Sequence, residues 1–160
     1  MRWLLLLLLL SCTDPVAAAG ETYRVTRIAD GDTLTVESER GPERIRFLGI
    51  DAPEMNWGRG RPECGAVESR DAVRRLVERK RVRIERRGTD DYGRTLAIVH
   101  LEKAPDGMAA LDRISLNEWL LRQGHAELFR KAVHPDRERF RQAERQARNA
   151  KRGMWRCGEK

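Results

Sequence analysis

Charged side chains gather where a predicted apolar strand ends. The residues from Arg46 to Glu54 read Arg-Phe-Leu-Gly-Ile-Asp-Ala-Pro-Glu, which begins as a strand and ends in a turn forced by proline. A strand built only for packing does not need the cation of Arg46 and the carboxylates of Asp51 and Glu54 around its apolar residues. Charges concentrated at such a point indicate a functional site.

Two further charged clusters stand at predicted turns, Asp30-Gly31-Asp32-Thr33 and Asp90-Asp91-Tyr92-Gly93-Arg94. Asp32 and Asp51 offer hard anionic oxygens, which suit Ca²⁺. An EF-hand is excluded, because the twelfth position counted from the first aspartate is Gly41 and not glutamate. An Asp-Gly pair is also an ordinary hairpin turn, but a turn alone does not explain Asp32.

The arginines and the glutamate fit phosphodiester chemistry. Arg46 and Arg94 each present a planar donor fork that matches a phosphate group. A phosphodiester gains negative charge during attack, and two guanidiniums with a metal stabilise that charge. Glu54 is a candidate general base for a water molecule. The plainer alternatives are a surface arginine beside a turn for Arg94 and a turn-stabilising residue after proline for Glu54.

The three clusters, in this order and at this spacing, resemble the staphylococcal nuclease (thermonuclease) family. The resemblance covers roughly residues 22–157. Four other stretches agree with it: Asn117-Glu118, Leu120-Leu121, Gln123-Gly124-His125-Ala126 and Gly153-Met154-Trp155.

The resemblance implies a Ca²⁺-dependent endonuclease that attacks DNA and RNA at the P–O5′ bond and leaves 3′-phosphate ends. It implies that Ca²⁺ is held by the carboxylates of Asp32 and Asp51 and by the backbone carbonyl of Ala52. The family often has threonine at the position of Ala52. The backbone carbonyl can still act as a ligand when this residue is alanine. The catalytic residues would be Arg46, Glu54 and Arg94.

The chain departs from the family at positions that bind the substrate. Tyr92 matches the tyrosine that contacts the terminal 5′ phosphate, but Asp91 precedes it where the family has a basic residue. The family's aromatic pair after the Gly-x-Ala segment is absent, and Arg130 and Ala132 stand near those positions, with Phe129 close by. Base stacking contributes about 1–3 kcal/mol per base, so we expect an altered substrate preference with the same chemistry.

The periodicity predicts an α+β protein built on an OB-fold barrel. Two-residue alternation predicts five strands, and a 3.6-residue pattern predicts three helices. The helix between the third and fourth strands is typical of an OB-fold, whose open side the last two helices would cover. The predicted strands are 22–28, 33–37, 44–50, about 82–84 and 94–101, and the predicted helices are 65–80, 115–123 and one whose first turn holds Pro135.

One geometric problem follows from these elements. Strict alternation puts Arg46 and Asp51 on opposite faces of one strand. If both side chains are to reach one phosphate, the backbone must bulge or twist between them. Gly49 is the residue that could allow it.

The N-terminus reads as an export signal ahead of a single domain. Residues 3–10 are an unbroken apolar run that is too short to span a bilayer as a helix. Leu9-Leu10-Ser11-Cys12 resembles a lipobox, in which Cys12 would be lipidated, and cleavage after Ala19 is the competing interpretation. We expect a signal and tether over residues 1–19 and a nuclease-like domain over 20–160. Either outcome predicts a periplasmic, secreted or envelope-anchored protein.

Two cysteines remain for the domain, Cys64 and Cys157. In an oxidising compartment such a pair is a disulfide candidate. The alternatives are two unrelated small apolar side chains or, with less support, a zinc site, for which no CxxC pair is present. Three isolated histidines give no catalytic triad and are read as structural or surface residues.

The net charge of +7 favours a polyanionic partner such as nucleic acid or an anionic membrane. We expect a monomer that acts on DNA and RNA, preferably single-stranded or denatured. The rival interpretations are an OB-fold module that binds nucleic acid without cutting it and a lipid-anchored structural protein of the cell envelope. The combination of three carboxylates and two arginines argues against a pure binder.

Overall fold

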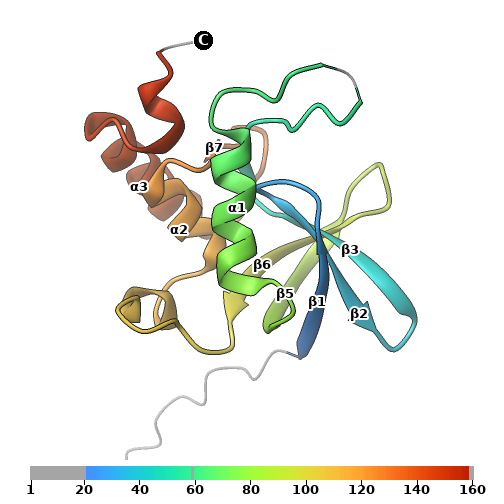
Figure 1. Ribbon diagram of the computed structural model, residues 1–160. Coiled ribbons are helices and arrows are strands. Elements are labelled where there is room, and N and C mark those ends of the chain that lie inside the picture. The colour runs from blue at the N-terminus through green and yellow to red at the C-terminus, as the bar shows by residue number, and fades with distance from the viewer. Residues whose placement is uncertain (1–20, 59, 159–160) are drawn as a thin grey trace, which may run out of the picture.

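The computed structural model describes residues 21–58 and 60–158 (Figure 1). The predicted export signal, the cleavage site after Ala19 and the lipidation of Cys12 lie outside these residues. No helix within the described ranges is long and apolar enough to cross a membrane.

Five strands close into a barrel in the order β1-β2-β3-β6-β5. The β3–β6 pair is parallel and the other pairs are antiparallel. The predicted OB-fold barrel of an α+β protein is thereby confirmed. The strands are β1 (Thr22–Ile28), β2 (Thr33–Ser38), β3 (Gly41–Phe47), β5 (Arg81–Thr89) and β6 (Thr95–Leu101).

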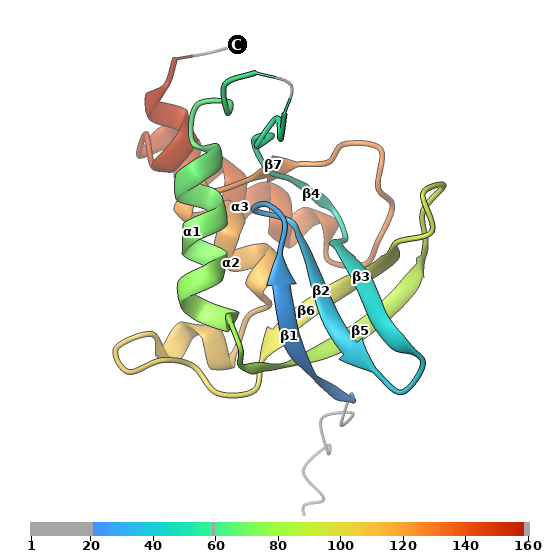
Figure 2. The same cartoon turned by 45° about the vertical axis from the view of Figure 1, so that its right-hand side comes forward.

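Three helices follow the predicted order, and one of them lies along the barrel beside β1 (Figure 2). Their ends differ from the prediction, since the first helix is shorter than 65–80 and the last begins two residues after Pro135. The helices are α1 (Ala66–Val77), α2 (Leu116–Gln123) and α3 (Arg137–Asn149), with short 3-10 turns η1 (Ala109–Asp112) and η2 (Gly153–Arg156).

The caps of α2 explain its sharp limits. Ser115 Oγ accepts a hydrogen bond from the Glu118 N–H at 3.2 Å, and Gly124 ends the helix in a left-handed conformation. The side chain of Glu118 does not complete a capping box. It is fully buried and instead pairs with Arg122 and Arg139.

The prediction of one continuous strand over residues 44–50 is wrong. β3 ends at Phe47, and after a turn the chain forms a separate two-residue strand, β4 (Ile50–Asp51), which pairs with β7 (Glu127–Leu128). Gly49 has φ +79°, a left-handed conformation that glycine adopts without steric strain and that cannot continue a strand. The chain therefore leaves the barrel at this point and turns toward the helical side.

Asn117 fixes the strand break against the barrel. This fully buried side chain donates from Nδ2 to the carbonyls of Leu48 and Ala97, at 3.0 and 3.1 Å, and its Oδ1 accepts from the Val99 N–H at 3.0 Å. The Leu48 N–H in turn donates to the Ala97 carbonyl at 2.8 Å. Backbone groups left over where the strand ends are thus satisfied by α2, which holds the turn in place.

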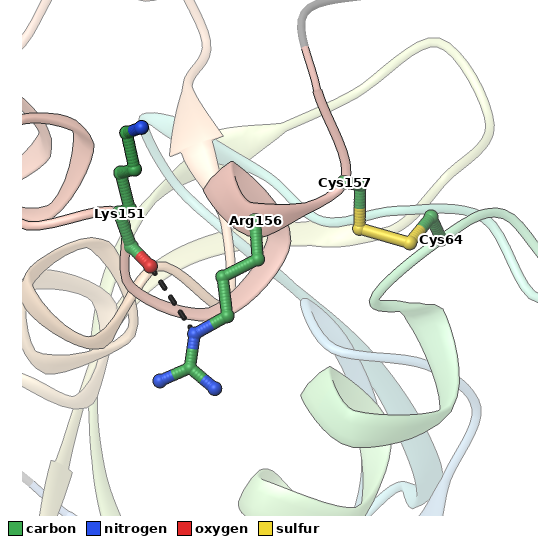
Figure 3. The surroundings of a disulfide bond; sticks show 4 residues. All are labelled: Cys64, Lys151, Arg156 and Cys157. Atoms are coloured by element: carbon green, nitrogen blue, oxygen red, sulfur yellow. Dashed lines mark hydrogen bonds between the residues drawn. A yellow bond between two sulfur atoms is a disulfide. The ribbon is translucent and has the colours of Figure 1, made fainter.

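The predicted disulfide between Cys64 and Cys157 is present, with an S–S distance of 2.04 Å (Figure 3). It joins the segment just before α1 to the end of η2. Beside it, Arg156 Nε donates to the Lys151 carbonyl at 3.2 Å. The bond ties the loop over residues 55–64, which follows Glu54, to the C-terminal end of the fold.

Candidate active site

The β1–β2 turn, the end of β3 and β4 meet at one end of the barrel (Figure 2). Thr33 pairs with Arg46 across β2 and β3, and the Phe47 N–H donates to the Asp32 carbonyl at 2.8 Å. The register therefore sets the two charged side chains of Asp32 and Arg46 next to each other.

Arg46 bridges the two aspartates that the sequence singles out. Its Nη1 lies 2.7 Å from Asp32 Oδ2, and its Nη2 lies 2.6 Å from Asp51 Oδ1. Nη1 also donates to the Ile50 carbonyl at 3.0 Å. Because the chain reverses at Gly49, residues of opposite parity reach the same side, which answers the geometric problem posed by the sequence.

Asp32 is a buried carboxyl, with 5% of its surface exposed. Oδ2 accepts from the Ala52 N–H at 2.6 Å, and Oδ1 accepts from the Thr33 hydroxyl at 3.0 Å. Burial raises the pKa of Asp32 to about 8, against the opposing effect of the Arg46 guanidinium. A further cation beside Asp32, in addition to Arg46, would stabilise the charged form of this buried carboxyl.

Glu54 stands at the exposed edge of the same site. Partial burial raises the pKa of its carboxyl, and the neighbouring carboxylates of Asp30 and Asp51 add to this effect. Its backbone is fixed by Glu63, because the Glu54 N–H donates to Glu63 Oε2 at 3.0 Å and the Glu63 N–H donates to the Glu54 carbonyl at 2.9 Å.

Arg94 is held by Asp90 at the β5–β6 hairpin. Arg94 Nε lies 2.6 Å from Asp90 Oδ2, and Asp90 Oδ1 accepts from the backbone N–H groups of Tyr92 and Arg94. The guanidinium carbon lies 5.4 Å from the centre of the Tyr92 ring, and Tyr92 is 82% exposed. An exposed aromatic ring and a fixed cation therefore lie together on the β5–β6 hairpin.

The β3–β6 pairing relates the two arginines. Arg46 pairs with Leu96 in a parallel register, and Phe47 pairs with Ala97, and the side chains of this second pair are buried in the core. Strand alternation then directs Leu96 to the opposite face, which is also the face of Arg46, and Arg94 immediately precedes β6. Arg94 contacts Asp90 and Tyr92, whereas direct contacts join Arg46 to Asp32 and Asp51.

The donor set fits a hard divalent cation. The carboxylate of Asp30 raises the pKa of both Asp32 and Glu54, and Asp51 raises that of Glu54 further, while Arg46 is the cation that opposes these effects. A divalent ion with oxygen ligands would offset this excess negative charge. Within the described ranges, no group of three or more His, Cys, Asp or Glu side chains has metal-site geometry. The ligand set implied by the resemblance contains only two side chains, and its third member is a backbone carbonyl.

Sequence reasoning missed the residues that hold the predicted ones. Asp30 Oδ1 accepts from the Asp32 N–H at 3.0 Å, Asp90 fixes Arg94, and Glu63 fixes Glu54. An aspartate that bonds a backbone N–H two residues on is a typical turn signal, which could have identified Asp30 and Asp90. Glu63 lies in an aperiodic loop and has no comparable signal.

The segment after Gly124 runs beside the site. The Phe129 N–H donates to the Gly49 carbonyl at 3.0 Å, and the Phe129 side chain is exposed. The three histidines, His100, His125 and His134, each have a pKa lowered by burial, which suits residues that pack within the fold.

Comparison with known proteins agrees with this geometry. A family model described as "Staphylococcal nuclease homologue" matches residues 44–157. The chain is 32% identical to a thermonuclease from Staphylococcus hyicus over 84% of its own length and 76% of that protein. It is 35% identical to an uncharacterized endonuclease from Escherichia coli O157:H7 over 97% of its length and 90% of that protein.

A micrococcal nuclease from Shigella flexneri is also similar, at 32% identity over 82% of this chain and 71% of that protein. The family match begins within β3 and covers β5, β6 and all three helices, and it includes the strand break with Arg46, Asp51 and Glu54. The chain belongs to the staphylococcal nuclease homologue family and is a hydrolytic nuclease.

Proposed function

We propose that this nuclease is a Ca²⁺-dependent endonuclease that hydrolyses the phosphodiester bonds of DNA and RNA, with a preference for single-stranded or denatured substrate. The single observation that carries the proposal is the contact of one guanidinium, that of Arg46, with both Asp32 and Asp51, at 2.7 and 2.6 Å. This arrangement sets a phosphate-binding cation directly against the proposed metal ligands.

Asp32, Asp51 and the Ala52 carbonyl would hold the ion, which when bound supplies Lewis-acid stabilisation of the phosphate's negative charge. Arg46 and Arg94 donate to the non-bridging phosphate oxygens as charge builds on them. Arg46 is available for this role if substrate replaces one of its two carboxylate partners. Tyr92, which lies beside Arg94, would contact a phosphate of the substrate.

Glu54 orients a water molecule and accepts its proton. A carboxyl whose pKa is raised by burial and by neighbouring carboxylates is a stronger base than an ordinary glutamate. The Glu54 side chain is exposed, so substrate and water can reach it. The hydrogen bond from its backbone N–H to Glu63 fixes the position of its backbone.

We also propose that the protein is exported, with residues 1–19 as signal and tether and with Cys12 as a candidate lipid anchor. The disulfide between Cys64 and Cys157 supports an oxidising compartment. The nuclease is proposed to act as a monomer. Mass measurement of the mature protein would distinguish lipidation at Cys12 from cleavage after Ala19.

The test is cleavage of denatured DNA by the purified protein in Ca²⁺ and in excess chelator. We expect cleavage that requires Ca²⁺ and falls about 10²- to 10⁴-fold in Glu54→Gln, because the general base is lost. Glu39→Gln, an exposed change on the β2–β3 hairpin, is the matched control and should cut normally. Binding without cleavage would overturn the proposal in favour of a non-catalytic OB-fold module, and full activity of Glu54→Gln would refute the role given to Glu54.

A further inference from the structure

Trp57 is a large, exposed and yet fixed aromatic side chain in the 55–64 loop. It is 62% exposed, which is unusual for a residue of this size. Its indole Nε1 donates to the Ala29 carbonyl at 3.1 Å, and the guanidinium carbon of Arg70 lies 5.7 Å from the ring centre. The ring is therefore held at its polar edge and by a neighbouring cation while most of its surface remains in water.

Both partners of the ring are themselves anchored. The Ala29 N–H donates to the Thr33 carbonyl at 3.0 Å, inside the turn that carries Asp32. Arg70, on α1, donates from Nε and Nη2 to Asp71 Oδ1 at 3.0 and 2.9 Å, and its side chain is only 15% exposed. Two separate elements, the β1–β2 turn and α1, thus hold one exposed ring in place.

The Trp57 ring also lies close in the sequence to Glu54, the proposed general base. Trp57 follows Glu54 by three residues, which limits the separation of their Cα atoms to about 11 Å. Its partner Ala29 adjoins Asp30, whose Oδ1 accepts a hydrogen bond from the Asp32 N–H at 3.0 Å, and Asp32 contacts Arg46 at 2.7 Å. A short series of direct contacts therefore connects the indole to the arginine that is proposed to bind the phosphate.

We propose that Trp57 is a base-stacking platform that binds an unpaired nucleobase of the substrate next to the scissile phosphate. This inference rests on the proposed function and adds a substrate-binding residue to it. An aromatic face stacks on any base, so the contact is tolerant of sequence, but it requires a base that is not already stacked in a duplex. A preference for single-stranded or denatured substrate follows from this requirement.

The positions of the other aromatic side chains support this role for Trp57. In the segment after Gly124, Arg130 and Ala132 carry no aromatic ring, and the exposed aromatic side chain there is Phe129. Tyr92 stands at the β5–β6 hairpin, whereas the 55–64 loop rises on the α1 side of β4 (Figure 2). Trp57 contacts Ala29 and Arg70, whereas Tyr92 lies beside Arg94, so the two rings are presented by different elements.

The experiment compares two single-stranded oligodeoxynucleotides, one with every base present and one with abasic sites on both sides of a single cleavable position. We expect Trp57→Ala to lower kcat/KM on the complete strand about 5- to 150-fold and to leave the abasic strand unchanged. Trp57→Phe keeps an aromatic face and should lose much less. Met108→Ala, which removes an exposed apolar side chain just before η1, is the control and should leave kcat/KM on both strands unchanged.

Equal losses on both strands would mean that Trp57 only supports the loop, and no loss on either would mean that it does not touch the substrate; each result overturns the inference. Binding of the same oligonucleotides, followed by fluorescence anisotropy in a Glu54→Gln background, gives a readout independent of cleavage. A chain that never cuts but binds the complete strand through Trp57 would refute the proposed function and support the stacking site. Cleavage without a base-dependent effect of Trp57→Ala would do the reverse.

Discussion

The backbone N–H of Glu54 donates to Glu63 Oε2 at 3.0 Å, and the Glu63 N–H returns a bond to the Glu54 carbonyl at 2.9 Å. This pair closes the 55–64 loop at its base. Glu63 is followed directly by Cys64, whose disulfide to Cys157 anchors the loop to η2 (Figure 3). The position of the proposed general base is therefore set by a neighbouring carboxylate and by a covalent bond to the far end of the chain.

Removing the Glu63 carboxylate, which accepts from the Glu54 N–H, should slow the chemical step without abolishing substrate binding. In Glu63→Ala the Glu54 backbone loses its acceptor, and misplacement of a reacting group by about 1 Å lowers rates by about 10²-fold. We expect kcat to fall about 10- to 100-fold with KM little changed. Glu63→Gln keeps an oxygen acceptor and should restore most of the activity. A parallel loss in both variants would contradict a positioning role, because it would point to the charge of Glu63 instead.

Breaking the disulfide should destabilise the domain. The bond closes a loop with a sequence separation of 93 residues, for which the chain-entropy model gives roughly 4–5 kcal/mol at most. We expect Cys64→Ser with Cys157→Ser to lower the free energy of unfolding by about 2–5 kcal/mol, measured by urea denaturation. Because both cysteines are exposed, reductant should produce the same shift in the wild-type protein and none in the double variant. An unchanged midpoint in reductant would contradict this prediction.

The strand break at Gly49 should tolerate no side chain. A Cβ at this position would lie 2.4 Å from His134 Nε2, and the backbone has φ +79°. Left-handed strain alone costs about 1–2 kcal/mol for a non-glycine residue. We expect Gly49→Ala to be destabilised by more than that amount, as measured by thermal unfolding.

Gly107→Ala is the matched control for this substitution. Gly107 has φ +78°, and a Cβ there would meet nothing within 4 Å, so the variant carries the backbone strain without the clash. The difference between the two variants measures the contact with His134. If both alanine variants lose the same stability, the close approach of His134 has no energetic weight.

The Glu43–Arg86 pair predicts an acid-dependent part of the stability. Arg86 donates to Glu43 through Nε and Nη2, at 3.1 and 2.8 Å, and Thr95 adds a hydroxyl bond at 2.7 Å. These contacts, led by the Arg86 hydrogen bonds and with a further contribution from Arg40, lower the pKa of Glu43 below its ordinary value of 4.5. A depressed carboxyl pKa stabilises the fold above the unfolded pKa, and this stability is lost as pH falls through the folded pKa.

We therefore expect Glu43→Gln to be less stable than the wild type at neutral pH, by about 1–3 kcal/mol for charge-assisted hydrogen bonds. The difference should shrink as the pH is lowered below 4.5, the ordinary value for this carboxyl. Urea denaturation at a series of pH values measures it, with the exposed Glu39→Gln as control. A difference that stays constant down to acid pH would show that shape, and not charge, accounts for the effect.

The fold was largely predictable because its signals are local. Two-residue alternation marked the barrel strands, and Ser115 and Gly124 marked the ends of α2. The break at residues 48–49 was not predictable as a break, because Leu48 and Ile50 are as apolar as the strand before them. It exists because Gly49 adopts a left-handed conformation and Asn117, distant in the sequence, satisfies the freed carbonyl of Leu48.

The sequence alone determined which residues carry charge at the strand ends, since residue type and turn chemistry are written locally. The contacts of Arg46 with Asp32 and Asp51, of Glu63 with Glu54, and of Trp57 with Ala29 follow from the folded arrangement. These relationships join segments that are separate in the chain, and their geometry depends on strand register and on the turn at Gly49. Spacing along a sequence does not specify such distances, because they are set when the barrel closes and the helices pack against it.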